Sequence, residues 1–174
     1  MSQKIDNQTF FTDNRYSEWN NPPVVVAWKF SSSENLGALL RVCDNFGVKQ
    51  VFFVGNEIDY KLSKIKRNAT TSFKKVDWSF VTVTELWEKL PKEVLKIAVD
   101  TTSDSVAISQ YDFRKIEKSF CLFFGNETIG LEDTVIQKCN TSVHIPMIGN
   151  SFSMNVVQAA SVTLYEVAKQ CVLD

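Results

Sequence analysis

The stretch Ile145-Pro-Met-Ile-Gly-Asn-Ser-Phe-Ser-Met-Asn155 decides how the C-terminal part of this chain folds. It joins a short strand-like run to a long apolar helix pattern that begins at Val156. N-capping of that helix explains one serine or asparagine, but not the proline, the glycine and the other polar residues. We therefore expect backbone groups and short polar side chains of this segment to form the rim of a pocket.

Outward from this segment, apolar strand-like runs alternate with helical patterns along most of the chain. Strands are predicted at residues 24–28, 51–54, 95–99, 119–124 and 142–145, with a brief one at Val76. Helices are predicted at residues 36–43 with a stop near Gly47, and at 61–69, 83–90, 131–139 and 156–172. This alternation predicts an α/β domain with a mostly parallel sheet flanked by helices.

The last helix has the clearest apolar stripe. Its predicted members are Val157, Ala160, Leu164, Val167, Ala168 and Cys171. Three loops that follow predicted strands contain unusual residues, and they begin near Thr101, Gly125 and Pro146. Ligands of parallel sheets bind outside the carboxyl ends of the strands, so we expect these loops to surround one pocket.

Length and composition indicate one ordinary globular domain. The chain has 174 residues, of which 44% are apolar and 22% charged. We expect residues 1–21 to form a short N-terminal extension and residues 22–174 to form the domain. No apolar run is long enough to cross a bilayer, and the polar N-terminus does not resemble a secretion signal, which predicts a cytoplasmic protein without membrane contact.

The metal-ligating residues are few and scattered. The single histidine, His144, favours a structural or surface role over a catalytic one. The cysteines form no CxxC pair, so the sequence predicts no metal site. They are Cys43, Cys121, Cys139 and Cys171.

The net charge is −1, which does not by itself indicate a nucleic-acid-binding protein. One segment is locally basic, and from the charge pattern alone we favour a solvated helix face, with an RNA-binding patch as the alternative. Its members are Lys61, Lys64, Lys66 and Arg67, followed by Lys74 and Lys75.

Two further segments combine glycines with polar or charged residues. In Asn35-Leu-Gly-Ala-Leu-Leu-Arg41, the asparagine is a possible helix cap, and the arginine needs an anionic partner, a wet cleft or a solvent-exposed face. In Phe123-Phe-Gly-Asn-Glu-Thr-Ile-Gly-Leu131, glycines allow close backbone approach. Glu127 is expected to bond either the backbone of a loop or a cationic partner. No dinucleotide fingerprint, Walker loop or nucleophile elbow is present.

Together these motifs resemble the three motifs of the SpoU (TrmH-like) branch of the SPOUT methyltransferases. The matching stretches are NLGALLRVCDNFG, FGNETIGL and IPMIGNSFSMNV, in the family's order and spacing. Met154 stands where leucine is usual, and the region from Arg67 to Phe73 lacks the Ser-Ala-Gly-Ala run of many relatives. The resemblance spans residues 24 to about 170, and it makes residues 22–174 a SpoU-type methyltransferase domain.

The resemblance implies a C-terminal deep trefoil knot, built from roughly residues 95–160, that holds S-adenosylmethionine. The implied cofactor-binding residues are Thr102, Gly125, Ile145 and Met154, supported by Met147 and Ser153. The implied reaction transfers a methyl group to a ribose 2′-hydroxyl of RNA, with tRNA favoured over rRNA.

Arg41 matches the family's catalytic arginine, which implies that it activates the hydroxyl or clamps an RNA phosphate. The residues implied to position Arg41, the hydroxyl and the cofactor are Asn35, Glu127, Ser153 and Asn155. The resemblance also implies a homodimer, for which the helices at 36–43 and 156–172 are the expected surface. The alternative is a catalytically silent knotted module that binds RNA or protein.

Overall fold

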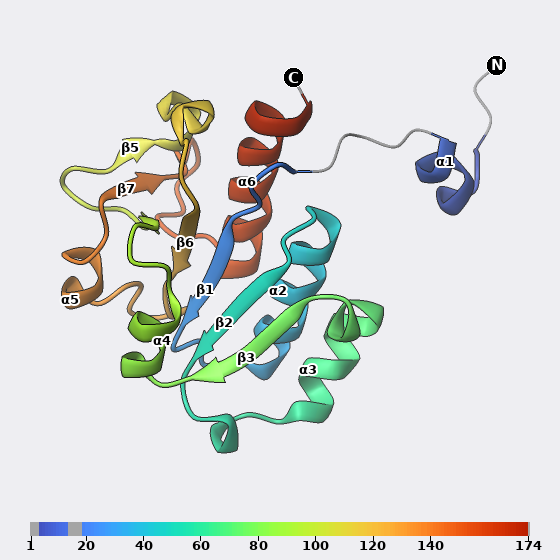
Figure 1. The fold of residues 1–174 in the computed structure, drawn as a ribbon, viewed down its shortest axis with the longest axis horizontal. Coiled ribbons are helices and arrows are strands. Elements are labelled where there is room, and N and C mark those ends of the chain that lie inside the picture. The colour runs from blue at the N-terminus through green and yellow to red at the C-terminus, as the bar shows by residue number, and fades with distance from the viewer. Residues whose placement is uncertain (1–3, 14–18, 174) are drawn as a thin grey trace.

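The centre of the molecule is a seven-stranded sheet (Figure 1). The computed structural model describes residues 4–13 and 19–173. The strands are β1 (Val24–Trp28), β2 (Gln50–Val54), β3 (Asp77–Val81), β4 (Leu95–Val99), β5 (Val106–Ala107), β6 (Phe120–Phe124) and β7 (Thr141–His144). They lie in the order β3-β2-β1-β6-β4-β7-β5, and each neighbouring pair is parallel. The predicted α/β class with a mostly parallel sheet is confirmed.

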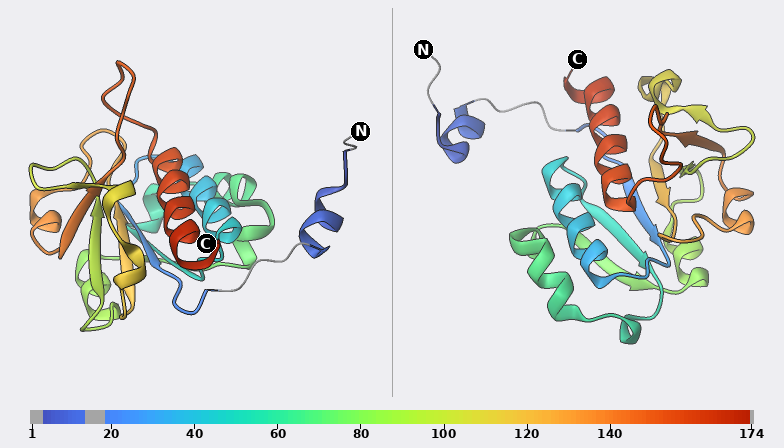
Figure 2. Two further views of the ribbon diagram at one scale, coloured as in Figure 1. Left: turned by 90° about the horizontal axis from the view of Figure 1, so that it is seen from above. Right: turned by 180° about the vertical axis from the view of Figure 1, so that it is seen from behind.

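Helices cover both faces of the sheet (Figure 2). The helices are α1 (Asn7–Asp13), α2 (Ser33–Asn45), α3 (Leu62–Ala69), α4 (Val83–Lys89), α5 (Asp133–Ile136) and α6 (Val156–Ala168). Short 3₁₀ turns are η1 (Glu57–Asp59), η2 (Thr70–Lys74), η3 (Ile108–Gln110) and η4 (Phe113–Lys115). Helices α2, α3 and α6 pack on one face, and α4 and α5 pack on the other.

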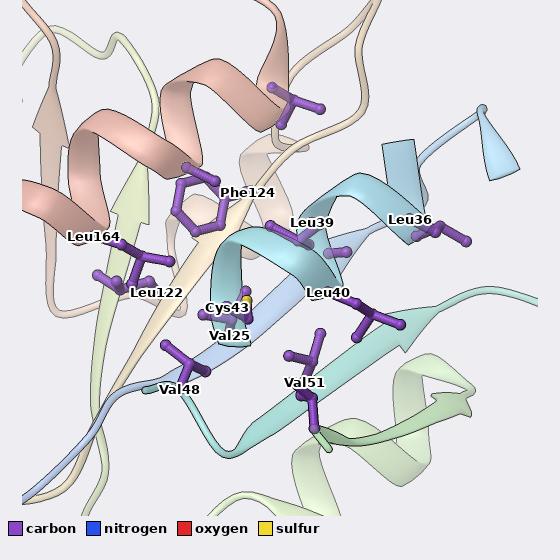
Figure 3. Close-up of a cluster of buried hydrophobic side chains, with 14 of the residues drawn as sticks. Val25, Leu36, Leu39, Leu40, Cys43, Val48, Val51, Leu122, Phe124 and Leu164 are labelled. Atoms are coloured by element: carbon purple, nitrogen blue, oxygen red, sulfur yellow. The ribbon is translucent and has the colours of Figure 1, made fainter. Parts of the chain in front are cut away.

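The alternation of side chains along each strand divides the core into two layers. Val25 and Ala27 of β1 contact the layer under α2, α3 and α6, whereas Val26 and Trp28 contact the layer under α4 and α5. All four residues are at most 2% exposed, as expected for a central strand of a parallel sheet. Figure 3 shows the first layer, in which leucines of α2 lie over β1 and β2.

Helix α2 begins at a serine cap and packs closely against α3. The Ser32 side chain accepts a hydrogen bond from the backbone N–H of Asn35 (3.2 Å), so Ser32 and not Asn35 is the N-cap. A Cβ added to Gly37 would lie 2.4 Å from the carbonyl oxygen of Ile65 and 2.8 Å from Cβ of Asn68. The glycine of the first motif therefore sets how closely α3 approaches α2.

Helix α6 follows the segment that ends at Asn155 and is capped by it. The Asn155 side-chain oxygen accepts hydrogen bonds from the backbone N–H groups of Val157 (2.9 Å) and Gln158 (3.4 Å). The α-helix ends at Ala168 and continues as a π-helical turn, Lys169–Leu173. The wider turn rotates the chain, so the prediction that Cys171 belongs to the buried stripe is wrong, and this cysteine is exposed.

Several predicted boundaries differ from the structure. The helix predicted at 131–139 is only Asp133–Ile136, because i→i+3 hydrogen bonds at Lys138 and Cys139 tighten the following turn. The strand near Val76 is β3, Asp77–Val81. Strand β5 was not predicted, since two residues are too short for a periodic pattern.

The remaining expectations concern the chain path and the N-terminus. Strand order does not define a knot, so the trefoil knot stays a prediction. Trp19 and Asn21, at the end of the expected extension, already contact the domain through the carbonyl oxygens of Phe46 and Lys118. The division of the chain at residue 22 also stays a prediction.

We predict that Gly37→Ala destabilises the protein by about 1–2 kcal/mol. The overpacking cost of forcing two backbones apart exceeds the roughly 1 kcal/mol that alanine gains over glycine within a helix. Urea unfolding measures the difference. Gly149→Ala is the matched control, because no atom lies within 4 Å of the added Cβ. A Gly37→Ala variant as stable as the unchanged protein contradicts the close-packing argument.

Candidate active site

A cavity of about 320 Å³ lies at the carboxyl ends of β4, β6 and β7. Its walls come from the loops after these three strands and from the first turn of α6. This is where the three post-strand loops were expected to meet, and they do surround one cavity. The volume lies within the range of small-molecule sites.

The loop after β6 can form only because two of its residues lack a side chain. A Cβ on Gly125 would lie 2.2 Å from the carbonyl carbon of Gly130 and 2.4 Å from the backbone nitrogen of Leu131. Gly130 has a φ of 68°, a conformation that favours glycine. Asn126 and Gly130 exchange two backbone hydrogen bonds of 3.0 and 2.9 Å, so the loop folds back on itself.

Asp100 ties this loop to the end of β4. Its Oδ2 accepts a hydrogen bond from the backbone N–H of Leu131 (2.7 Å), and its Oδ1 accepts one from the backbone N–H of Thr101 (2.8 Å). The carboxylate also approaches Gly130, where an added Cβ would lie 2.6 Å from Oδ2. Asp100 is not among the site residues predicted from the sequence. Its place directly after a buried strand is the signal that could have indicated it.

Glu127 connects the same loop to the start of α2. Its carboxylate accepts hydrogen bonds from the backbone N–H (2.7 Å) and hydroxyl (2.9 Å) of Ser31. It also accepts bonds from the backbone N–H of Ser32 (3.3 Å) and the side-chain amide of Asn35 (2.7 Å). The sequence left two roles open for Glu127, a bond to the backbone of a loop or to a cationic partner. Its contacts with Ser31 and Ser32 fit the first of these roles.

Hydrogen bonding favours the charged form of this carboxylate. Partial burial raises the pKa of Glu127, but the bonds from Ser31 and Asn35 outweigh this effect and hold the pKa below its ordinary value of 4.5. The group is therefore an anion at neutral pH, and it lies on the cavity wall.

The structure brings six of the predicted site residues to the cavity wall. They are Gly125, Glu127, Ile145, Met147, Ser153 and Met154. Asn155 caps α6, and Asn35 bonds Glu127, so both contribute to the frame of the site. Thr102 does not line the cavity, but its neighbour Thr101 does.

Arg41 lies away from this cavity in the same chain. It is exposed on α2 and has no hydrogen bond or ion pair to any of the residues that the structure describes. Of the three environments considered for this arginine, the observed one is a solvent-exposed helix face.

His144, for which the sequence favoured a structural or surface role, is a further residue of the cavity. It lies on the wall, and its Nδ1 is 3.0 Å from the hydroxyl oxygen of Ser105. Ser105 also accepts a hydrogen bond from the backbone N–H of Thr102 (3.1 Å). Of the structural and surface roles expected for His144, the contact with Ser105 is a structural one, and the residue also lies at the cavity.

Two kinds of feature are absent from residues 4–13 and 19–173. Within this range, no helix has the length and apolar character needed to span a bilayer. Nor does this range contain a group of three or more histidine, cysteine or acidic residues able to hold a metal ion.

The parallel sheet and the cavity at the carboxyl ends of its strands define a class of protein. Comparison of the sequence with known proteins identifies that class. The model of the SpoU rRNA methylase family matches residues 22–165. The chain therefore belongs to this family, and the resemblance drawn from the three motifs is confirmed.

Individual relatives differ in their RNA substrates. The chain is 28% identical over 152 residues to the tRNA (guanosine(18)-2′-O)-methyltransferase of Aquifex aeolicus, covering 84% of this chain and 69% of that protein. It is 30% identical over 141 residues to the 23S rRNA (guanosine-2′-O-)-methyltransferase RlmB of Acinetobacter baylyi, covering 78% and 55%. It spans only half of the 23S rRNA (uridine(2479)-2′-O)-methyltransferase of Streptomyces viridochromogenes, covering 80% of this chain and 50% of that protein.

Solved structures share the fold. The A. aeolicus TrmH/SpoU tRNA modifying enzyme has a TM-score of 0.74 at 25% identity, covering 89% of this chain and 77% of that one. The SpoU methyltransferase AviRb from Streptomyces viridochromogenes, in complex with the cofactor AdoMet, has a TM-score of 0.74 at 24% identity. That match covers 91% of this chain and 60% of AviRb, and it shows likeness of fold alone.

We predict that Glu127→Gln lowers the unfolding free energy by about 1 kcal/mol at pH 7, since an amide cannot accept all the bonds that the partly exposed carboxylate accepts. A lowered folded pKa contributes stability above the ordinary value of 4.5, and this contribution is lost as the pH falls through the folded pKa. The difference between the two proteins should therefore shrink as the pH falls below 4.5, as measured by urea unfolding.

Glu93→Gln is the control for this experiment. Glu93 forms an exposed ion pair with Lys118, and we expect its loss to change stability by less than about 0.5 kcal/mol at every pH. A Glu127→Gln effect no larger than that of the control contradicts the role of Glu127 as a connector.

Proposed function

We propose that the protein transfers a methyl group from S-adenosylmethionine to a ribose 2′-hydroxyl of RNA. The observation that carries the proposal is the cavity of a SpoU family domain, whose walls come from the loops after β4, β6 and β7. The loops after β6 and β7 contain the second and third motifs. Relatives named as 2′-O-methyltransferases of tRNA and of 23S rRNA support it.

The charge of the cavity suits this cofactor. Its lining contains the carboxylates of Asp100 and Glu127 and no lysine or arginine. Such a wall attracts a sulfonium and an ammonium group and disfavours the phosphates of nucleotide cofactors. Apolar side chains of Ile129, Ile145 and Met154 offer a surface for a flat purine ring.

We assign cofactor contacts to Gly125, Ile145, Met147, Ser153 and Met154, which line the cavity. Thr102 belongs to the same proposal through its loop, with Thr101 as the residue on the wall. The bound cofactor supplies an electrophilic methyl carbon on sulfur. With the cofactor bound, the hydroxyl oxygen would form a bond to this carbon as the carbon–sulfur bond breaks, the neutral thioether would leave, and the hydroxyl proton would pass to solvent.

Arg41 is our proposed residue for handling that hydroxyl. A guanidinium offers five N–H donors and no acceptor, so clamping an RNA phosphate or stabilising negative charge on the oxygen suits it better than accepting the hydroxyl proton. Asn35 and Glu127 position the first turn of α2, the helix that contains Arg41, and Asn155 positions α6. Ser153 is the hydroxyl-bearing residue on the cavity wall.

We infer a homodimer in which α2 and α6 form the contact. Exposed apolar side chains on α6 include Val162 and Tyr165, which are 40% and 54% exposed. Tyr165 lies edge-on against Phe46 at the end of α2, so the two helices present one continuous surface. A second copy bound to this surface brings its own cavity to the exposed Arg41, which does not line the cavity of its own chain.

The favoured substrate within this proposal is tRNA. The relative from Aquifex aeolicus is named as a tRNA methyltransferase, and it is matched over a larger share of its length than the rRNA enzymes. Mass spectrometry of tRNA and rRNA nucleosides from cells lacking the gene tests the assignment. The cytoplasmic location expected from the sequence stays a prediction.

We predict that Arg41→Ala and Arg41→Lys lower turnover at least about 100-fold, the usual cost of removing one transition-state contact. Cofactor affinity, measured by calorimetry, should change little, because Arg41 does not line the cavity. Lys89→Ala controls for the loss of one surface charge. Full RNA methylation by either Arg41 variant overturns this role, and a protein that binds no cofactor overturns the enzyme assignment.

We further predict that two inactive variants regain activity when mixed. Met154→Trp fills the cavity and should abolish cofactor binding, whereas Arg41→Ala leaves the cavity intact. In a mixed dimer, the Arg41→Ala copy offers an intact cavity and the other copy offers Arg41. Recovered methylation after unfolding and refolding the two together supports a shared site. A monomeric mass, or no recovery from a verified mixed dimer, contradicts it.

A further inference from the structure

The outer surface of α3 and η2 is the most strongly charged part of the chain. Residues 61–75 contain six lysines and arginines and no acidic residue, although the chain as a whole has a net charge of −1. We call this region, from Lys61 to Lys75, the α3–η2 surface. Figures 1 and 2 show α3 at the β3 end of the sheet, outside α2.

Most of these cations are not used by the fold. Lys64 forms an ion pair with Glu34 (2.6 Å), and Lys75 lies 3.7 Å from Asp44. The other four have no hydrogen-bonded or ionic side-chain partner among the residues that the structure describes, and each is exposed. They are Lys61, Lys66, Arg67 and Lys74.

Helix stability does not explain the whole pattern. Lys66 and Arg67 lie in the last turn of α3, where cations are favourable. Lys61 occupies the N-cap without a capping side-chain bond, and Lys64 lies in the first turn, near the positive end of the helix dipole. Ile65 and Ala69 are the two buried residues of α3. Lys64 is already paired with Glu34, but Lys61 opposes the helix dipole without an acidic partner among the described residues, and a bound anion would offset that cost.

The α3–η2 surface adjoins the candidate active site through the start of α2. The backbone N–H of Lys61 donates to the hydroxyl of Ser33 (2.9 Å). Ser31 and Ser32, just before it, hold the Glu127 carboxylate on the cavity wall. Backbone bonds and serine side chains thus connect the first cation of α3 to the margin of the cavity.

Arg41 lies on the side of α2 that faces this surface. Gly37, one turn earlier, packs against Ile65 and Asn68 of α3. Asp44, three residues later, accepts a hydrogen bond from the hydroxyl of Ser72 in η2 (2.7 Å). Residues three and four apart share a helix face, so Arg41 projects beside α3 and η2.

We propose that the α3–η2 surface binds the sugar–phosphate backbone of the RNA substrate and leads it past Arg41. The inference rests on the proposed RNA methyltransferase function and adds the surface on which the RNA lies. Exposed lysines and arginines on flexible stems suit phosphates and do not select a sequence. Each neutralised phosphate releases counterions, so binding through this surface depends steeply on salt concentration.

The test compares two double variants. Lys61→Gln/Lys66→Gln removes two unpartnered cations of the α3–η2 surface. Lys89→Gln/Lys92→Gln removes the same charge at and beyond the end of α4, which packs on the opposite face of the sheet. Affinity for an unmodified tRNA transcript is measured by fluorescence anisotropy between about 50 and 200 mM salt. Cofactor binding is measured by calorimetry on the same samples.

We expect the α3–η2 variant to bind the transcript more weakly and to lose about 1.4–1.8 from the slope of log affinity against log salt, at roughly 0.7–0.9 per phosphate contact. Cofactor binding should be unchanged in both variants, and the control should keep the original slope. An unchanged slope in the α3–η2 variant overturns the inference and leaves this surface to another anionic partner, such as an acidic protein. Absent cofactor binding in the unchanged protein instead defeats the proposed function.

Discussion

The site depends on the hydrogen bonds that the carboxylate of Glu127 accepts. This carboxylate joins the loop after β6 to the loop before α2, two segments separated by more than 90 residues. Its partners are two backbone N–H groups, one hydroxyl and one amide, so one side chain fixes both the wall of the cavity and the first turn of α2. Because Arg41 follows on that helix, its position depends on the same carboxylate.

Close backbone approach is the second constraint. Gly37 lets α3 lie against α2, and Gly125 lets the loop after β6 fold onto its own end. Asp100 completes this loop by accepting a hydrogen bond from the backbone N–H of Leu131. These glycines matter because they have no Cβ atom. The site is therefore framed largely by backbone groups, which have no side-chain rotamers to change.

Charges of opposite sign lie on different surfaces of the molecule. The cavity wall carries the acidic residues Asp100 and Glu127, which suits a cationic cofactor. The α3–η2 surface carries four cations that have no side-chain partner among the described residues, which is consistent with the proposed contact with RNA phosphates. The net charge of −1 hides this separation, because a sum over the chain carries no information about position.

The sequence by itself determined the alternation of strands and helices, the loops with unusual residues after three strands, and six of the residues on the cavity wall. These follow from local periodicity and from residue chemistry within short stretches. Only the tertiary structure decided that Glu127 bonds Ser31 and Asn35, that Asp100 and His144 lie at the cavity, and that Arg41 is exposed. Each of these depends on contacts between segments distant in the chain, which a pattern in one segment does not encode.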